Sequence, residues 1–264
     1  MTESHIFAGL DGQPRSKKPR SVGLTMVVDW GMGPSRQQDL QLTAAAYFDF
    51  AKIAVGLSRM YPPDVLTQKI QSYRSLDIEP FPGGQYLEYA EMNGKLDLYL
   101  PACQEAGYRW IEVSDNVAPV ELDWKVAIIR DAVDNYGMNV FGEVGKKEGF
   151  SHGPSFVEDA KACLDAGAKI ILLEAAELVN ADAETEREVE ETIEAIGVER
   201  VMFELPGPWI EGVTDSVIHR MRRELVDRFG NEVNIGNVMP DDLYSFEAYR
   251  RELGVNAGSP SDAD

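Results

Sequence analysis

Short apolar runs alternate along the chain with longer segments in which apolar residues recur every three or four positions. The short runs have the length of strands, and the periodic segments have the length of helices. The strands predicted in this way cover residues 23–29, 50–55, 78–82, 109–115, 138–143, 169–174, 200–204 and 233–237. The predicted helices cover residues 38–48, 63–75, 85–93, 95–106, 121–136, 155–166, 183–196, 216–229 and 240–253.

Several of these strands have a continuous apolar interior, as residues 26–28 show. Continuous apolar strands are typical of parallel sheets that helices cover on both faces. Eight such strands, separated by helices, predict a single-domain (β/α)8 TIM barrel over residues 21–253. A doubly wound open sheet is the competing fold, but no glycine-rich dinucleotide-binding turn follows a strand. Residues 1–20 are expected to form a polar arm and residues 254–264 a polar tail.

The predicted strands end in polar residues. The carboxyl ends of barrel strands converge on one mouth, where the active sites of such enzymes lie. The residues expected there are Asp29, Lys52, Gly83, Gly84, Glu112, Ser114, Glu143, Lys146, Lys147, Glu174, Glu204 and Asn237. Acidic side chains are costly to bury unless a cation, a lysine or a shared proton compensates them. The mouth is therefore expected to hold a cation or a network of ion pairs.

Mg²⁺ suits this mouth because it takes hard oxygen ligands and keeps several waters. The ligands are expected among Asp29, Glu143, Glu174 and Glu204. The three histidines lie in the predicted arm, a loop and a helix, so a zinc site is not expected. The alternative explanation is a structural salt-bridge network in which Lys52 pairs with the acids.

The lysines at the mouth are candidates for proton transfer or for binding an oxyanion. Lys52, Glu143 and Lys147 form the predicted catalytic set. Schiff-base chemistry is also open to a barrel lysine, but neighbouring carboxylates would keep the amine charged. The expected substrate-binding residues are Gly83, Gly84, Ser114, Lys146 and Asn237.

The composition excludes some classes of partner. The net charge is −20, with 45 acidic against 25 basic residues, whereas nucleic-acid binding needs a basic surface. No apolar run reaches the roughly 18 residues of a membrane span, and the first 20 residues lack a signal-peptide core. We expect a cytoplasmic protein that self-associates and binds a small anionic molecule. The two cysteines lie in helical patterns and are expected to be buried free thiols.

Particular segments resemble the phosphosulfolactate synthase family. They are Gly23-Leu-Thr-Met-Val-Val-Asp29, Phe50-Ala-Lys52, Pro82-Gly-Gly-Gln-Tyr-Leu-Glu88-Tyr-Ala90, Ile111-Glu-Val-Ser-Asp115, Glu143-Val-Gly-Lys-Lys147 and Phe203-Glu204 with Pro206. The resemblance spans nearly the whole chain, from about residue 18 to about residue 253. It implies a (β/α)8 barrel that requires Mg²⁺ and adds sulfite to phosphoenolpyruvate, giving (2R)-phospho-3-sulfolactate. This product belongs to sulfonate metabolism, including coenzyme M biosynthesis. By resemblance, Lys147 is the expected proton donor and Lys52 an anion clamp.

The chain departs from the family pattern at three places around the mouth. Trp30 stands where a lysine follows the first-strand Asp, Ala175-Ala176 stands near the usual position of an arginine, and Pro206-Gly-Pro-Trp209 replaces a polar loop. Each change removes polar or positive character. A divergent member that takes a less anionic substrate therefore stays an alternative. A non-catalytic barrel, like the plant heat-stress-associated relatives, is the second alternative.

Overall fold

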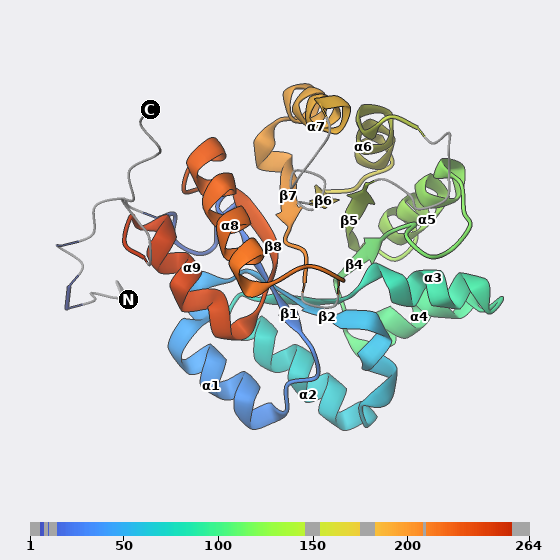
Figure 1. Ribbon diagram of the computed structural model, residues 1–264. Helices are drawn as coiled ribbons and strands as arrows, with labels where there is room; N and C mark the ends of the chain where they lie inside the picture. The colour runs from blue at the N-terminus through green and yellow to red at the C-terminus, as the bar shows by residue number, and fades with distance from the viewer. Residues whose placement is uncertain are drawn as a thin grey trace.

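The computed structural model describes residues 6–7, 10, 15–145, 154–174, 183–207 and 210–254. Within them, parallel strands form an inner sheet that helices surround (Figure 1). The strands are β1 (Thr25–Asp29), β2 (Phe50–Ile53), β3 (Glu79–Pro82), β4 (Trp110–Val113), β5 (Asn139–Val144), β6 (Ile170–Glu174), β7 (Val201–Glu204) and β8 (Asn234–Val238).

The helices of the described chain alternate with these strands. They are α1 (Pro34–Ala44), α2 (Pro63–Arg74), α3 (Gly84–Met92), α4 (Leu96–Ala106), α5 (Leu122–Asp134), α6 (Phe156–Asp165), α7 (Ala183–Ile196), α8 (Asp215–Phe229) and α9 (Leu243–Arg250). Within the described ranges, short 3₁₀ segments join them, among them η2 (Ala45–Tyr47), η3 (Ala54–Met60), η5 (Val198–Arg200) and η6 (Pro240–Asp242). None of the helices within the described ranges is both long and apolar enough to cross a lipid bilayer.

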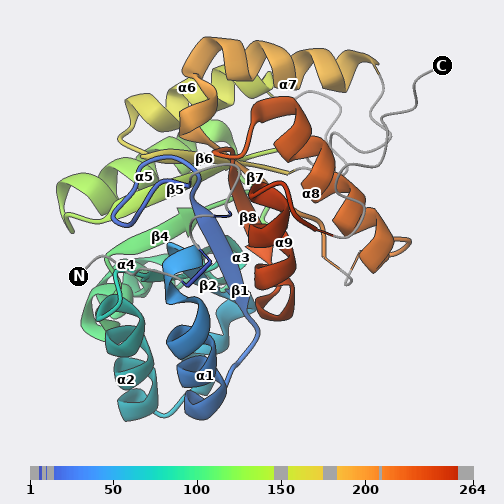
Figure 2. The ribbon, with the colours of Figure 1, turned by 90° about the vertical axis from the view of Figure 1, so that its left-hand side faces the viewer.

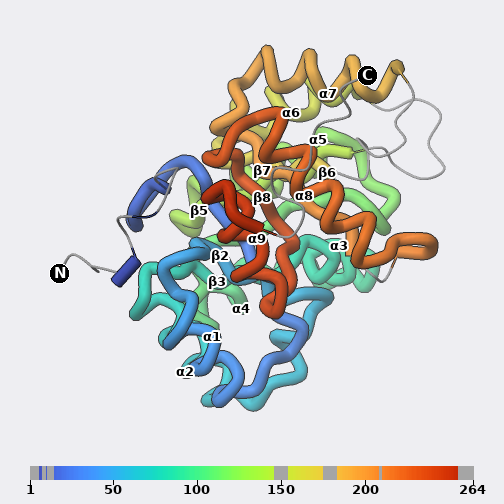
Figure 3. Tube along the Cα trace, turned by 60° about the vertical axis from the view of Figure 1, so that its left-hand side comes forward, coloured from blue at the N-terminus to red at the C-terminus, as the bar shows by residue number. Residues whose placement is uncertain are grey.

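The strand order is β3-β2-β1-β8-β7-β6-β5-β4, so the first and last strands of the chain pair with each other. Strands β3 and β4 lie side by side and bring the sheet close to closure. Helices α1 and α2 lie on one side of this barrel and α6 and α7 on the opposite side (Figure 2). Helices α8 and α9 pack beside each other next to β8 (Figure 3). The predicted single-domain (β/α)8 barrel is confirmed.

Two apolar layers hold the barrel together. The layer between strands and helices includes Val27, Ala51, Ile111, Val140 and Phe203. A second layer fills the barrel interior, with Met26, Phe50, Phe81, Phe141, Leu172 and Met202. The aromatic rings of this inner layer meet edge to face or tilted, as for Phe50 and Phe141, whose centroids are 5.0 Å apart. This packed plug ends below the carboxyl ends of the strands, where a pocket opens.

The predicted strands agree with the structure to within a few residues at each end. The first helix differs more, because it begins at Pro34 rather than at residue 38. Gly33 is its N-cap residue, and proline at the first helical position has a favourable fixed φ. Cys103 and Cys163 are free and buried, as expected.

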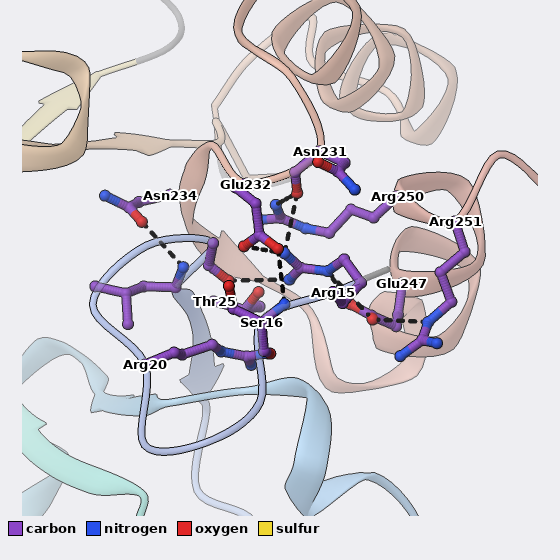
Figure 4. Close-up of polar contacts among 12 residues, drawn as sticks. Arg15, Ser16, Arg20, Thr25, Asn231, Glu232, Asn234, Glu247, Arg250 and Arg251 are labelled. Carbon is purple, nitrogen blue, oxygen red and sulfur yellow. Dashed lines mark hydrogen bonds and ion pairs between the residues drawn. The ribbon is translucent and has the colours of Figure 1, made fainter. Parts of the chain in front are cut away.

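Residues 15–20 of the predicted N-terminal arm pack against the amino end of the barrel. The buried Arg15 pairs with Glu232 at 2.7 Å and with Glu247 of α9 at 3.3 Å (Figure 4). Its Nη2 donates to the Gly23 carbonyl at 3.0 Å. Gly23 has φ +67, and a Cβ there would lie 1.9 Å from a Glu232 carboxylate oxygen. Glycine is therefore required where the chain passes this ion pair.

Arg15→Ala is expected to lower the free energy of unfolding by about 2–3 kcal/mol, near the lower end for breaking a buried ion pair. The loss is moderate because Glu232 keeps access to solvent. Urea denaturation would measure it, with the exposed Lys17→Ala as a matched control. Equal midpoints for both variants would contradict a structural role for Arg15.

Candidate active site

A pocket of about 270 Å³ opens at the carboxyl ends of the strands. Residues from seven strands line it, together with loop residues that follow the strands. The lining residues are Val28, Trp30, Lys52, Ala54, Val55, Gly83, Gly84, Gln85, Glu112, Asn116, Glu143, Glu174, Glu204 and Asn237. The mouth predicted from the strand ends therefore exists as a single pocket.

Strand alternation explains why the acids meet there. Glu174 and Glu204 are neighbours across β6 and β7, and Glu143 lies across from Leu172 of the inner apolar layer. Successive side chains point to opposite faces of a strand, so residues two positions apart share the interior face. Phe141 and Glu143 thus form consecutive layers, one apolar and one charged.

Lys52 is the cation among the described residues that line the pocket. Its Nζ lies 2.7 Å from Glu112 Oε2 and 2.5 Å from Glu204 Oε1. Burial lowers the pKa of Lys52, but the charges of Glu112 and Glu204 more than offset this and raise it above its ordinary value. Lys52 is thus a fixed positive charge, and this argues against Schiff-base chemistry, which needs a neutral amine.

Two carboxyl groups of the pocket hold protons more tightly than usual. Burial, with the negative charges of Glu204 and Glu112, raises the pKa of Glu143 well above its ordinary value. Burial also raises the pKa of Glu204 to about 7, although the Lys52 ammonium lowers it. The Glu143 carboxyl therefore keeps its proton to a higher pH than an ordinary glutamate does, and Asn116 Nδ2 donates to its Oε1 at 2.6 Å. A carboxyl in this state can donate a proton.

The glycine pair before α3 forms one wall of the pocket. The backbone N–H of Gly84 donates to Glu112 Oε1 at 2.8 Å. A Cβ on Gly84 would lie 2.2 Å from Ser114 Oγ and 2.9 Å from Glu112 Oε1. Glycine is therefore needed for α3 to begin this close to β4.

Asn237, on the opposite wall, has a left-handed backbone with φ 56. Its buried Oδ1 has no hydrogen-bond partner within the described part of the chain. An unsatisfied buried acceptor of this kind is uncommon and points to a ligand that donates or coordinates. The predicted binding residues Gly83, Gly84 and Asn237 thus all reach the pocket.

The structure does not bring Asp29 into the pocket. Its side chain leaves β1 on the outer face, where Oδ2 lies 2.5 Å from Lys69 Nζ and accepts from the Tyr73 hydroxyl at 2.7 Å. Its Oδ1 accepts from the backbone N–H groups of Gly31 and Met32. The carboxylate is fully buried and fully used between β1 and α2. These contacts give the Asp29 carboxylate a structural role, and it is not one of the carboxylates that line the pocket.

Ser114 also lies away from the pocket lining. Its hydroxyl donates to Glu88 of α3, because the chain turns after β4 ends at Val113. The predicted residues Lys146 and Lys147 lie outside the described residues, as do Ala175, Ala176 and Trp209. Trp30 is described and lines the pocket.

Sequence reasoning missed Asn116, which lies in the loop after β4 and contacts Glu143. It also missed Lys125 of α5, a fully buried cation whose Nζ donates to the Glu143 carbonyl at 2.8 Å and to Asp159 at 2.8 Å. A lysine among the apolar positions of a helix was the available signal for the second residue. Nothing in the pattern of a loop marks the first.

The pocket residues fit a hard cation. Glu112, Glu143, Glu174 and Glu204 give it an excess of negative charge over the single described cation, and the Asn237 oxygen adds a neutral donor. Within the described ranges, no group of three His, Cys, Asp or Glu side chains has the spacing of a ready-made metal site. Mg²⁺ needs fewer protein ligands than that, since waters and substrate oxygens complete its octahedron.

A (β/α)8 barrel with a lysine and several acids at the carboxyl ends of its strands has the architecture of a barrel enzyme. The sequence profile of the (2R)-phospho-3-sulfolactate synthase (ComA) family matches residues 13–255. The chain belongs to this family.

Two relatives are similar to the chain over most of its length. The phosphosulfolactate synthase of Methanothermobacter thermautotrophicus is 32% identical over 91% of this chain and 93% of the relative. The phosphosulfolactate synthase of Methanocaldococcus jannaschii is 30% identical over 88% of this chain and 92% of the relative. Among solved structures, the YdjI aldolase of Escherichia coli superposes with a TM-score of 0.53 at 10% identity, covering 88% of this chain and 86% of that one. This last likeness concerns the fold alone.

Proposed function

We propose that the chain catalyses the Mg²⁺-dependent addition of sulfite to phosphoenolpyruvate, giving (2R)-phospho-3-sulfolactate. The observation that carries the proposal is the pocket in which Lys52 lies between Glu112 and Glu204, in a chain of the phosphosulfolactate synthase family. Sulfite would form a bond from sulfur to the methylene carbon, and a proton would then reach the adjacent carbon.

Each pocket group has a task in this reaction. The negative charge that develops on the carboxylate side of the substrate needs a positive neighbour, and Lys52 stays charged there. Mg²⁺, held by carboxylates among Glu143, Glu174 and Glu204, would further stabilise that charge. The Gly83-Gly84 backbone and Asn237 supply polar groups on two walls of the pocket for orienting the substrate.

The proton donor is either Glu143 or Lys147. Glu143 lines the pocket, and its raised pKa favours the protonated carboxyl. A cation would reverse this, because a ligating carboxyl must lose its proton. One carboxyl cannot serve as ligand and acid in the same step, so a Glu143 ligand would leave donation to Lys147.

The test is an incubation of the protein with Mg²⁺, phosphoenolpyruvate and sulfite, followed by phosphorus NMR. A new phosphate-ester resonance that requires both substrates is the expected result. Trp30 at the pocket supports the alternative of a less anionic substrate, since it adds an aromatic surface where the family pattern has a cation. A folded protein that binds Mg²⁺ and gives no product would favour that alternative. A folded protein that gives no product and does not bind Mg²⁺ would favour a non-catalytic barrel.

Mg²⁺ binding is expected to weaken at least about tenfold in Glu143→Gln, because one charged hard ligand is replaced by a neutral amide. Isothermal titration calorimetry would measure this against wild type and against Asp241→Asn, a change of an exposed carboxylate. Equal affinities in all three proteins would remove Glu143 from the ligand set.

A further inference from the structure

Three consecutive residues after β4 each contact a different element of the barrel. Ser114 Oγ donates to Glu88 of α3, and Asp115 pairs with Lys125 of α5 at 3.2 Å. Asn116 Nδ2 then donates to Glu143 of β5 at 2.6 Å. We call residues 114–118 the β4 turn. It links two helices to a pocket carboxyl.

Glu88 determines the conformation of the β4 turn. Its side chain is fully buried, and one oxygen accepts from the Val117 and Ala118 backbone N–H groups at 2.6 and 2.7 Å. The other oxygen accepts from Ser114. One carboxylate therefore satisfies two backbone donors and one hydroxyl. Hydrogen bonds to a charged acceptor are roughly twice as strong as neutral ones.

A second hydrogen bond, from the backbone of helix α3 to a side chain of β4, also fixes the helix to the strand. Gly84, one helical turn before Glu88, donates its N–H to Glu112 Oε1, and it approaches Ser114 too closely to carry a side chain. The carboxylate of Glu88 is thus held in place relative to the strand end. Asn116 lies between the groups that Glu88 holds, Ser114 on one side and Val117 and Ala118 on the other.

We propose that Glu88 is a positioning residue that acts through Asn116, holding its amide against the Glu143 carboxyl. Glu88 is absent from the pocket lining, so it acts without touching the substrate. The main chain of Glu143 is fixed separately, by Lys125 on its carbonyl. The β4 turn thus controls the side chain of Glu143, and α5 controls its backbone. The catalytic consequence rests on the proposed function, but the coupling between Glu88 and Asn116 does not.

The test is a double-mutant cycle with Glu88→Gln, Asn116→Ala and the double variant. Glutamine keeps the size of the side chain and one acceptor oxygen, so the barrel should still fold. Displacing a group near the reacting atoms lowers kcat/KM, here by on the order of 10- to 100-fold in each single variant. The double variant is expected to be no worse than Asn116→Ala alone, because Glu88 acts only through that residue.

Asp49→Asn is the matched control. Asp49 is a buried carboxylate that accepts from Arg20 and from the Thr25 N–H at the amino end of the barrel. Asp49→Asn should lower stability and leave kcat/KM at the wild-type value. Added to Asn116→Ala, it should leave kcat/KM at the value of Asn116→Ala alone. A double variant whose fold-loss in kcat/KM equals the product of the losses in Glu88→Gln and Asn116→Ala would overturn the proposal.

A second readout needs no turnover. The loss of unfolding free energy caused by Asn116→Ala, measured in urea, should be smaller in the Glu88→Gln background than in wild type and unchanged in the Asp49→Asn background. An inactive wild-type protein would contradict the proposed function, and the stability cycle would then decide the role of Glu88. Equal losses in all backgrounds would show that Glu88 does not position Asn116.

Discussion

Replacing Lys52 with methionine is expected to lower kcat/KM by roughly 10²–10³-fold, the usual loss when one preorganised electrostatic group is removed from an active site. Methionine fills similar space without charge. The change leaves Glu112, Glu143 and Glu204 buried together without the cation that now lies between two of them. These carboxyl groups would take up protons, because burying uncompensated charge costs more than protonation. The pocket would then lack the positive charge that faces the substrate.

Lys52→Arg is the informative comparison for this variant. It keeps the charge but spreads it over a planar group that does not match a site built around one ammonium nitrogen. Steady-state assays, with melting curves to confirm folding, should give the highest kcat/KM for wild type, a lower value for Lys52→Arg and the lowest for Lys52→Met. Full activity in Lys52→Met would show that the Lys52 ion pairs are only structural.

Asp29→Ala is expected to lower the free energy of unfolding by about 3–5 kcal/mol, the usual cost of leaving one partner of a buried ion pair alone. Lys69 would lose its partner at 2.5 Å, and the Tyr73 hydroxyl and two backbone N–H groups would lose their acceptor. Urea denaturation would measure the loss. The milder Asp29→Asn keeps an acceptor oxygen and serves if the alanine variant does not fold.

The same variants separate the two roles open to Asp29. Because its carboxylate faces α2, folded Asp29→Asn should bind Mg²⁺ with wild-type affinity in calorimetry. An asparagine variant that kept its stability and lost Mg²⁺ binding would place Asp29 back among the metal ligands.

The sequence was sufficient to predict the barrel and most of the pocket, because both follow from strand periodicity. Glu112 and Glu143 stand out as charges inside apolar strands, and buried charges of this kind need compensating partners such as those at a barrel mouth. Asp29 was misplaced because β1 is apolar on both faces, so its pattern does not show which residues point inward. Met26 points inward, and alternation then turns Asp29 toward the helices.

Beyond the strand ends, periodicity no longer applies. Ser114 was expected at the mouth together with Glu112, but β4 ends at Val113 and the following turn redirects it to Glu88. Glu88 itself resembles an ordinary helix-surface residue. The available signal was that Glu88 lies four residues after Gly84, which places both residues on the helix face toward β4. Asn116 depends on a turn geometry that only tertiary contacts determine.

The ion pairs of Arg15 also constrain how the chain is made. Arg15 and Glu247 are 232 positions apart, and β1 pairs with β8, which is synthesised late. A ribosome adding about 5–20 residues per second needs on the order of tens of seconds between the two partners. During that time β1 has no neighbour on its β8 side, and an unpaired strand edge invites pairing with other chains. Closure of this barrel is therefore a late, long-range event that waits until β8 has been made.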